Sequence, residues 1–362
     1  MSVVFWVAAG LLIYTQVGYG LLLALLPRPR RVAAAWSGPL PPVSVIVAAH
    51  NEQDVIGDRV ANLRALDYPD TEIIVVSDGS TDATVARAAG ADRVLDLPRG
   101  GKVPAQDAAV AVAGGELLAF TDANAAWRPD ALRRLVDAFG DPKVGYACGR
   151  VSFSAPEGSD NQEGLYWRYE MFLRARESAL YSITAGNGAI YAVRAEAYQV
   201  VPPMMSHDIS FPFKLVKRGW RAVYVPEALA TEKMAPSIET EFARKRRMAR
   251  RSWPTVLAGG MLSPRGYPPL YALMIFSHRL LRYASPFLHL VALAANIAAV
   301  ALGAGPLYIA TLACQVALLV AALLGLAIAR YYVWTTASLG VGLIDWLAGA
   351  NTVTWESVEG TR

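Results

Sequence analysis

Three short apolar runs, each bounded by polar or turn-forming residues, divide the middle of the chain. They have the length and composition of buried strands and lie at 43–50, 72–78 and 116–122. A stretch with helical spacing follows each of them, at 54–66, 81–91 and 130–139. Apolar strands alternating with amphipathic helices are typical of a largely parallel sheet covered by helices on both faces. The pattern therefore predicts an α/β domain.

Long apolar stretches lie on either side of this region. Residues 3–26 contain no charge and are long enough to cross a bilayer core of roughly 30 Å. Arg28, Arg30 and Arg31 follow without a small-residue cleavage site, which favours a retained anchor over a cleaved signal peptide. By the positive-inside bias, we expect these arginines in the cytoplasm and the N-terminus outside.

Beyond residue 255 the composition becomes apolar again. Residues 284–304 and 306–329 are predicted as two further spans, the first running outward and the second returning to the cytoplasmic side. Residues 331–349 are also apolar but contain Asp345 near the far end. This stretch is either a fourth span or a segment lying in the membrane interface, and periodicity does not choose between them.

The overall composition agrees with a protein that combines a soluble domain with membrane-spanning segments. Of 362 residues, 54% are hydrophobic and 18% are charged, with a mean hydropathy of +0.30. This is too apolar for an ordinary cytosolic protein and too charged for a pure membrane bundle. The net charge of +4 is modest and by itself decides nothing about nucleic acid. We expect no nucleic-acid partner. Cys148 and Cys314 are far apart and predict neither a disulfide nor a cysteine-based metal site.

Polar residues follow each predicted strand directly. They are Asn51-Glu52, Asp78-Gly79-Ser80 and, after the third strand, Asp122 with Asn124. In open parallel sheets ligands bind beyond the carboxyl ends of the strands. The three polar groups together therefore predict one binding site.

Six short motifs occur along the chain in a fixed order. They read VIVAAHNE (45–52), VVSDGSTD (75–82), GGK (100–102), FTDAN (120–124), GNGAIYAVR (186–194) and HD (207–208). In this order and spacing they resemble the signatures of family 2 glycosyltransferases with the GT-A fold. The resemblance covers roughly residues 43–255. It implies a GT-A-like α/β domain, mostly parallel, which this chain combines with transmembrane and interfacial helices.

The resemblance places a nucleotide-sugar donor, most simply a UDP-sugar, at the strand ends. Glu52 and Asp78 match the family positions that hold the base and ribose, because carboxylates accept hydrogen bonds from N–H and hydroxyl groups. Lys102 follows two glycines that let the backbone approach closely, and it is placed to meet phosphate. Two structural alternatives stay open: Asp78 caps the helix that begins near Thr81, or Lys102 is a solvated loop lysine. Asp82 is interpreted as a capping or solvated residue.

The family also carries an Asp-x-Asp motif that binds Mg²⁺ or Mn²⁺ bridging the two phosphates. Here the motif reads Asp122-Ala123-Asn124. Extended residues two apart point the same way, so both side chains are expected to face one ion. Asn124 offers a neutral carbonyl oxygen, which is a weaker ligand for a hard cation. The alternative is that the pair only forms a turn.

An inverting transfer needs a carboxylate that takes the proton from the attacking acceptor hydroxyl. By resemblance that general base is Asp208. His207 departs from the family pattern and is expected either to pair with Asp208 or to be exposed. Gly186, Asn187 and Gly188 resemble the loop that lines the acceptor side.

A basic run, ARKRRMARRSW, covers residues 243–253. One interpretation is an amphipathic helix on the membrane surface with Trp253 in the interface. The other follows the resemblance, because polymer-making members carry QxxRW here, a string that this chain lacks. Arg247 or Arg250 would then reach the diphosphate. A second amphipathic stretch, 267–283, is expected at the same surface.

The function predicted from these features is a membrane-bound inverting glycosyltransferase with a lipid or glycan acceptor. Its location would be the cell membrane, crossed several times, with the catalytic domain in the cytoplasm. Two alternatives are a processive polysaccharide synthase and a non-catalytic membrane protein that binds nucleotide sugars. The predicted domains are an anchor (1–36), the GT-A domain (37–236), interface helices (237–283), transmembrane helices (284–350) and a tail (351–362).

Overall fold

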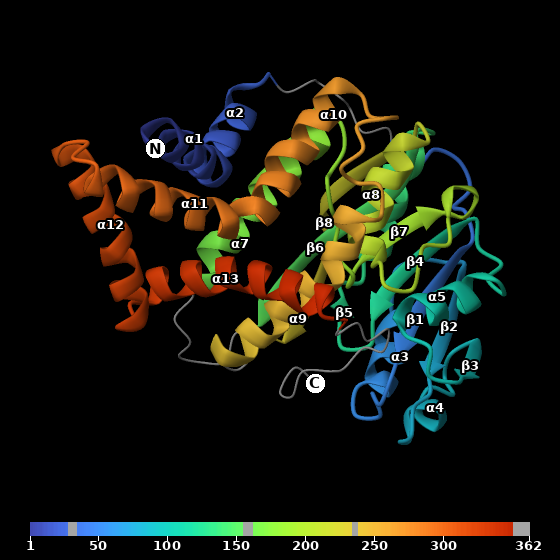
Figure 1. Ribbon diagram of the computed structural model, residues 1–362. Helices are drawn as coiled ribbons and strands as arrows, with labels where there is room; N and C mark the ends of the chain where they lie inside the picture. Colours follow the sequence, from blue (N-terminus) through green and yellow to red (C-terminus); the bar gives the residue numbers. More distant parts are fainter. Residues whose placement is uncertain (28–34, 155–161, 234–237, 350–362) are drawn as a thin grey trace.

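The computed structural model describes residues 1–27, 35–154, 162–233 and 238–349 (Figure 1). The arginines at 28, 30 and 31 and the predicted tail at 351–362 lie outside the described residues. The described chain forms an eight-stranded sheet with helices on both faces, beside a group of long apolar helices. An α/β domain combined with apolar helices is thus confirmed.

The sheet has the strand order β3-β2-β1-β4-β7-β6-β8-β5. Its strands are β1 (Val43–Ala49), β2 (Thr71–Asp78), β3 (Arg93–Leu97), β4 (Leu117–Asp122), β5 (Ala126–Trp127), β6 (Val144–Ser154), β7 (Tyr191–Arg194) and β8 (Arg221–Lys233). The half formed by β3, β2, β1 and β4 is parallel, as the sequence predicts. The other half is mixed, because β7 runs antiparallel to both β4 and β6.

The reversed direction of β7 has a direct consequence for the strand ends. Tyr191, the first residue of β7, pairs with Phe120 near the end of β4. The loop that precedes β7 therefore ends at the carboxyl edge of the parallel strands. A fully parallel strand in this place would have brought its following loop there instead.

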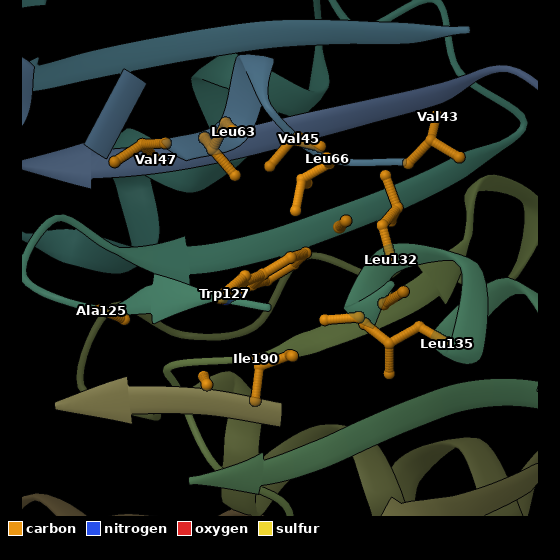
Figure 2. Close-up of a cluster of buried hydrophobic side chains, with 14 of the residues drawn as sticks. Val43, Val45, Val47, Leu63, Leu66, Ala125, Trp127, Leu132, Leu135 and Ile190 are labelled. Atoms are coloured by element: carbon orange, nitrogen blue, oxygen red, sulfur yellow. The ribbon is translucent and has the colours of Figure 1, made fainter. Parts of the chain in front are cut away.

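Six helices accompany the sheet. They are α3 (Ile56–Arg64), α4 (Thr84–Arg87), α5 (Lys102–Val110), α6 (Ala131–Asp137), α7 (Gln162–Leu180) and α8 (His207–Lys217). Figure 2 shows one buried face, where Val43, Val45 and Val47 of β1 lie beside Leu63, Trp127, Leu132 and Leu135. The intervening residues of β1, Ile46 and Ala48, belong to the core on the opposite face. Both faces of β1 are buried, which explains its uninterrupted apolar sequence.

The opposite face contains an aromatic cluster built around His207. The rings of Phe120 and Tyr191 stack at 4.8 Å, and those of His207 and Phe211 at 4.3 Å. His207 is 3% exposed, and its Nδ1 lies 2.9 Å from the Tyr191 hydroxyl. Burial, helped by the charge of Lys102, lowers the pKa of His207 to about 3. The expectation that His207 is exposed or paired with Asp208 is wrong, because its ring fills the aromatic core.

Three helices among the described residues are long and apolar enough to cross a membrane: Ser2–Leu25, Pro269–Ala301 and Pro306–Leu323. The first comprises α1 (Ser2–Ile13), a π-helical turn (Tyr14–Gly18) and α2 (Tyr19–Leu25). The second comprises α10 (Pro269–Met274), a π-helical turn (Ile275–Leu280) and α11 (Leu281–Ala301). The third is α12, and α1 and α12 both contact α11.

Two predicted boundaries in this region are wrong. The amphipathic stretch 267–283 is not separate from the following span, because the helix continues from Pro269 to Ala301. The span predicted at 306–329 ends at Leu323, where Gly325, with φ +82°, separates it from α13 (Ala327–Leu347).

The last described helix, α13, lies along α9 (Ile238–Leu257), as Figure 1 shows. Arg246 forms an ion pair with Asp345 at 2.6 Å, and Phe242 packs on Trp334 at 5.2 Å between ring centroids. Phe242 and Arg246 lie four residues apart and so share one face of α9. That face contacts α13 rather than lipid.

We predict that Leu132→Ala destabilises the α/β domain strongly. Leu132 is fully buried beneath the sheet, so the substitution leaves a cavity that costs about 2–5 kcal/mol of unfolding free energy. Urea denaturation in mild detergent, followed by tryptophan fluorescence, measures the loss. The control is Val200→Ala, an exposed position that should change the unfolding free energy by less than about 0.5 kcal/mol. Equal effects of the two variants would contradict this packing.

We also predict a pH dependence of stability that originates at His207. The unfolded chain binds a proton near pH 6.5, whereas the folded pKa is about 3. Between these values acid favours the unfolded state, so stability decreases as the pH falls below about 6.5. Between pH 7 and 5 the wild type should lose about 2 kcal/mol more unfolding free energy than His207→Phe. Parallel pH profiles for the two proteins would disprove the assignment.

Candidate active site

The parallel strands bring the predicted polar residues to one edge of the sheet. Asp122 at the end of β4 pairs in register with Ala48 of β1, and Ala48 pairs with Val76 of β2. Asp78 ends β2, two residues beyond Val76, and Glu52 follows β1 after a short turn. The predicted cluster at the carboxyl ends is therefore present.

Asp78 is buried and only half satisfied by the protein. Its Oδ1 accepts hydrogen bonds from the backbone N–H groups of Gly100 (2.6 Å) and Gly101 (2.9 Å). Its Oδ2 has no hydrogen-bond partner within the described part of the chain, although the residue is only 1% exposed. The helix α4 begins at Thr84, so Asp78 does not cap it. A buried carboxylate oxygen of this kind is suited to a ligand N–H or hydroxyl donor.

The loops after β1 and β2 hold each other in place. Asn51 has a left-handed φ of 53°, and its Oδ1 accepts the N–H of Thr81 at 2.8 Å. The N–H of Glu52 donates to the Thr84 hydroxyl at 2.8 Å. Asp82 accepts the Thr84 N–H at 3.0 Å just before α4, whose N-cap residue is Ala83. Glu52 is consequently fixed and nearly buried at the edge of the site.

Lys102 and Asp122 form an ion pair at the centre of the strand-end cluster. Lys102 is the first residue of α5, so it lies on a helix start and not in an extended loop. A side chain at Gly188 would lie 3.5 Å from Lys102 Nζ and 3.6 Å from Asp122 Oδ2. Gly188 therefore leaves room for a ligand directly beside the ion pair.

The geometry of Asp122-Ala123-Asn124 differs from the expectation. The strand ends at Asp122, and the next residues form a turn closed by the Ala125 N–H and the Asp122 carbonyl at 3.3 Å. The argument from an extended backbone therefore does not apply to Asn124. Both side chains are half-buried at the same strand end.

The residues present fit a divalent cation only if a ligand completes the coordination. Within the described ranges, no group of three His, Cys, Asp or Glu side chains could hold a metal ion alone. Asp122 and Asn124 offer hard oxygen donors. Mg²⁺ and Mn²⁺ are commonly bound by one or two carboxylates together with substrate phosphates and water. Asp122 and Asn124 fit an ion of this sort, whose remaining ligands come from a bound phosphate group and water.

Asp208 lies in the first turn of α8, and its backbone is hydrogen-bonded to the glycine-rich loop, Thr184–Gly188. The Gly186 N–H donates to the Asp208 carbonyl at 2.7 Å. A side chain at Gly186 would lie 2.0 Å from the Tyr146 hydroxyl, so only glycine fits there. Asn187 binds backbone on both sides, donating to the Gly149 carbonyl (2.7 Å) and accepting the Ile190 N–H (2.9 Å). Both ends of the Asn187 amide therefore help to shape the loop.

In the basic run, the structure overturns the prediction that Trp253 lies in the membrane interface. Trp253 is 5% exposed and donates through Nε1 to the Leu339 carbonyl at 2.9 Å, which fixes α9 to α13. It therefore contacts neither lipid nor a diphosphate. Arg247 and Arg250 are half-buried on α9.

Several charged residues near the site lie outside the six sequence motifs. Burial and the charge of Asp122 raise the pKa of Glu232, on β8, to about 7. Burial lowers the pKa of Arg59 to about 9, although Asp122 acts in the opposite direction. Burial also lowers the pKa of Arg251, and the charge of Asp208 opposes the shift. Only Arg251, inside the basic run, carried a sequence signal.

Comparisons with known proteins agree with this geometry. Residues 44–200 match the model of glycosyl transferase family 2. A beta-monoglucosyldiacylglycerol synthase of Nostoc sp. is 35% identical over 142 residues, which cover 36% of this chain and 30% of that protein. An N-acetylglucosaminyltransferase of Rhizobium leguminosarum bv. viciae is 27% identical over 238 residues, or 59% of this chain and 56% of that protein. The chain thus spans about a third to just over half the length of these relatives.

One solved structure resembles nearly the whole chain. It is the mannosyltransferase PcManGT from Pyrobaculum calidifontis in complex with GDP-Man and Mn²⁺, with a TM-score of 0.73 and 24% identity. The likeness covers 96% of this chain and 100% of that one. At this identity it establishes the shared fold. Residues 44–200 therefore form a family 2 glycosyltransferase domain, and the chain has the GT-A fold.

Proposed function

We propose that the chain transfers a sugar, with inversion, from a nucleotide diphosphate sugar to a hydroxyl group of an acceptor held at the membrane. The loop Thr184–Gly188 is the single observation that carries this proposal. Gly186 is hydrogen-bonded to the backbone of Asp208, and Gly188 lies beside Lys102 and Asp122. This short segment thereby connects the proposed proton acceptor, Asp208, with the ion pair of Lys102 and Asp122 that would meet the diphosphate.

The donor is proposed to be a UDP-sugar, bound along the strand ends. Asp78 Oδ2 would accept an N–H of the base, and Glu52 the ribose hydroxyls. Lys102 would exchange its contact with Asp122 for the phosphates, because a diphosphate carries more charge than one carboxylate. The buried position of Asp78 supports this arrangement, since an unpaired buried oxygen gains most from a new donor.

A divalent cation, Mg²⁺ or Mn²⁺, is proposed as the cofactor. Asp122 and Asn124 would hold it, and when bound it would neutralise charge on the leaving diphosphate. Lys102 adds a second positive charge at the same place. Because Asn124 is neutral, the cation would depend on the nucleotide for most of its affinity.

In the transfer step Asp208 would take the proton of the acceptor hydroxyl. The acceptor oxygen forms the new bond to the anomeric carbon while the bond from that carbon to the phosphate oxygen breaks. The electron pair of the broken bond leaves with the diphosphate. The chain contributes a fixed position for Asp208, which comes from the first turn of α8 and the Gly186 hydrogen bond.

The acceptor is proposed to be a lipid or a membrane-held glycan, with the catalytic domain on the cytoplasmic side of a membrane that the chain crosses several times. Three helices long and apolar enough to span a bilayer support this. A glycolipid synthase among the relatives supports a lipid acceptor. Glycolipid formation by single transfer is favoured over polymer synthesis because the chain lacks the QxxRW string.

We expect Asp208→Asn to lower kcat by about 10²–10⁴-fold while nucleotide affinity stays unchanged, since the amide cannot accept the proton. The assay is release of nucleotide diphosphate from a panel of UDP- and GDP-sugars by the full chain in lipid bilayers with membrane lipid extract. Asp130→Asn, at the start of α6, is the matched control and should keep full activity. Unchanged turnover in Asp208→Asn would refute the general base. Nucleotide binding without any turnover would favour the non-catalytic alternative, and the product length separates single transfer from polymer synthesis.

We expect metal affinity to follow the charge at the strand end. With UDP present, Asp122→Asn should weaken Mn²⁺ binding and Asn124→Asp should strengthen it, because a hard cation prefers charged oxygen ligands. Electron paramagnetic resonance of unbound Mn²⁺ measures both changes, and a chelator should abolish turnover. Equal Mn²⁺ affinity in wild type and both variants would place the ion elsewhere.

A further inference from the structure

The glycine-rich loop has a second side, which faces away from the catalytic centre. Thr184, at its start, is fully buried and donates its N–H and hydroxyl to Oε2 of Glu177 at 3.2 and 3.1 Å. Arg174 donates to the Gly186 carbonyl at 3.0 Å. Glu177 and Arg174 lie one turn apart on α7. One face of α7 therefore holds the loop from behind.

The other oxygen of Glu177 is bound by the two longest apolar helices. Oε1 accepts the Tyr19 hydroxyl of α2 at 2.7 Å and His278 Nδ1 at 2.7 Å. Arg279, next to His278, donates to the Thr184 hydroxyl oxygen at 2.9 Å. Glu177 is 1% exposed, and it thus links the loop to residues inside both candidate spans.

The charge of Glu177 makes these contacts strong. Burial alone would raise the pKa of Glu177, but the adjacent His278 and Arg279 lower it, so the carboxylate stays ionised. Hydrogen bonds to a buried ionised group are shorter and stronger than neutral ones. Removing one of them leaves a buried charge less well satisfied, and the surrounding segments must shift.

Arg176 also fixes the end of α2 at this place. Arg176, also on α7, donates to the carbonyl of Leu23 at 2.8 Å and of Ala24 at 3.1 Å, which satisfies the C-terminal end of α2. The two π-helical turns meet where the Tyr14 hydroxyl lies 2.8 Å from that of Ser277. Such turns are rare and occur frequently at functional sites.

We infer that Glu177 and Thr184 are positioning residues that make the catalytic loop depend on the seating of the N-terminal apolar helix. When Tyr19 is in contact with Glu177, the loop holds Gly186 against Asp208 and Gly188 beside Lys102. When α2 is displaced, Glu177 loses a hydrogen bond and the loop loosens on the acceptor side. The inference rests on the proposed glycosyl transfer for its kinetic consequence, but the physical link between helix and loop does not.

The test compares two hydroxyl deletions on the same helix, in the full chain in lipid bilayers. Tyr19→Phe removes the hydrogen bond to Glu177, and Tyr14→Phe removes the one to Ser277, which does not reach the loop. We expect Tyr19→Phe to lower kcat/KM for the acceptor roughly tenfold to a hundredfold, since small misplacements have effects of this size. Nucleotide affinity should not change. Tyr14→Phe should match the wild type.

A second pair tests the loop end of the same link. Thr184→Val keeps the volume but removes the hydroxyl, and it should reproduce the Tyr19→Phe defect. Thr184→Ser keeps the hydroxyl and should restore acceptor kinetics. A merely structural role would lower the thermal midpoint in Thr184→Val and Thr184→Ser alike and would weaken nucleotide and acceptor binding together. That outcome overturns the inference.

Hydrogen–deuterium exchange of residues 183–188 separates this inference from the proposed function. Tyr19→Phe should raise the exchange rate in this segment, and Tyr14→Phe should not. If the wild type transfers no sugar, the proposed function fails, yet faster exchange in Tyr19→Phe still supports the link. Unchanged exchange in Tyr19→Phe overturns the link even if transfer is observed.

Discussion

The shared register of β1, β2 and β4 is the constraint on which the candidate site depends. Because the three strands are parallel and aligned at Ala48, their carboxyl ends form a single edge. Asp78 and Asp122 occupy that edge, and neither could move without breaking a ladder that is buried on both faces. The antiparallel β7 then brings the glycine-rich loop to the same edge from the other direction. The ends of the parallel strands and the loop before β7 therefore meet at one edge of the sheet.

A second constraint is the burial of charge around this edge. Arg59 lies beneath the site and donates to Thr121, the residue before Asp122, at 2.7 Å. Such a buried cation is tolerable only close to compensating carboxylates, and Asp122 and Glu232 provide that compensation. The carboxylates of the site are thus held in place electrostatically from below as well as by backbone register. Any ligand that approaches from above meets groups whose positions are already set.

The sequence predicted the parallel half of the sheet well, because an apolar run followed by a polar turn depends mainly on local chemistry. The same holds for the positions of Asp78 and Asp122 at strand ends and of Asp208 in the first turn of a helix. Glu232 escaped notice because its proximity to Asp122 comes from the pairing of β8 with β5, which no local pattern records. The burial of His207 and Trp253 was not predicted, because aromatic residues far away in the sequence, such as Phe120 and Tyr283, pack on these side chains. The turn at Asn124 required knowledge of where β4 ends.

The contact between α2 and α7 makes residues near the start of the chain part of the core of the α/β domain. From the sequence alone they resemble a simple membrane anchor that any other apolar helix could replace. In the fold, Tyr19 and Leu23 are part of the same core as Leu173 and Phe213 of the α/β domain. Arg176 and Glu177 would lose their hydrogen-bond partners on α2 if the helix were removed or replaced. A truncation designed to yield a soluble enzyme would therefore cut through the catalytic domain, because its interior begins inside the segment that looks like the anchor.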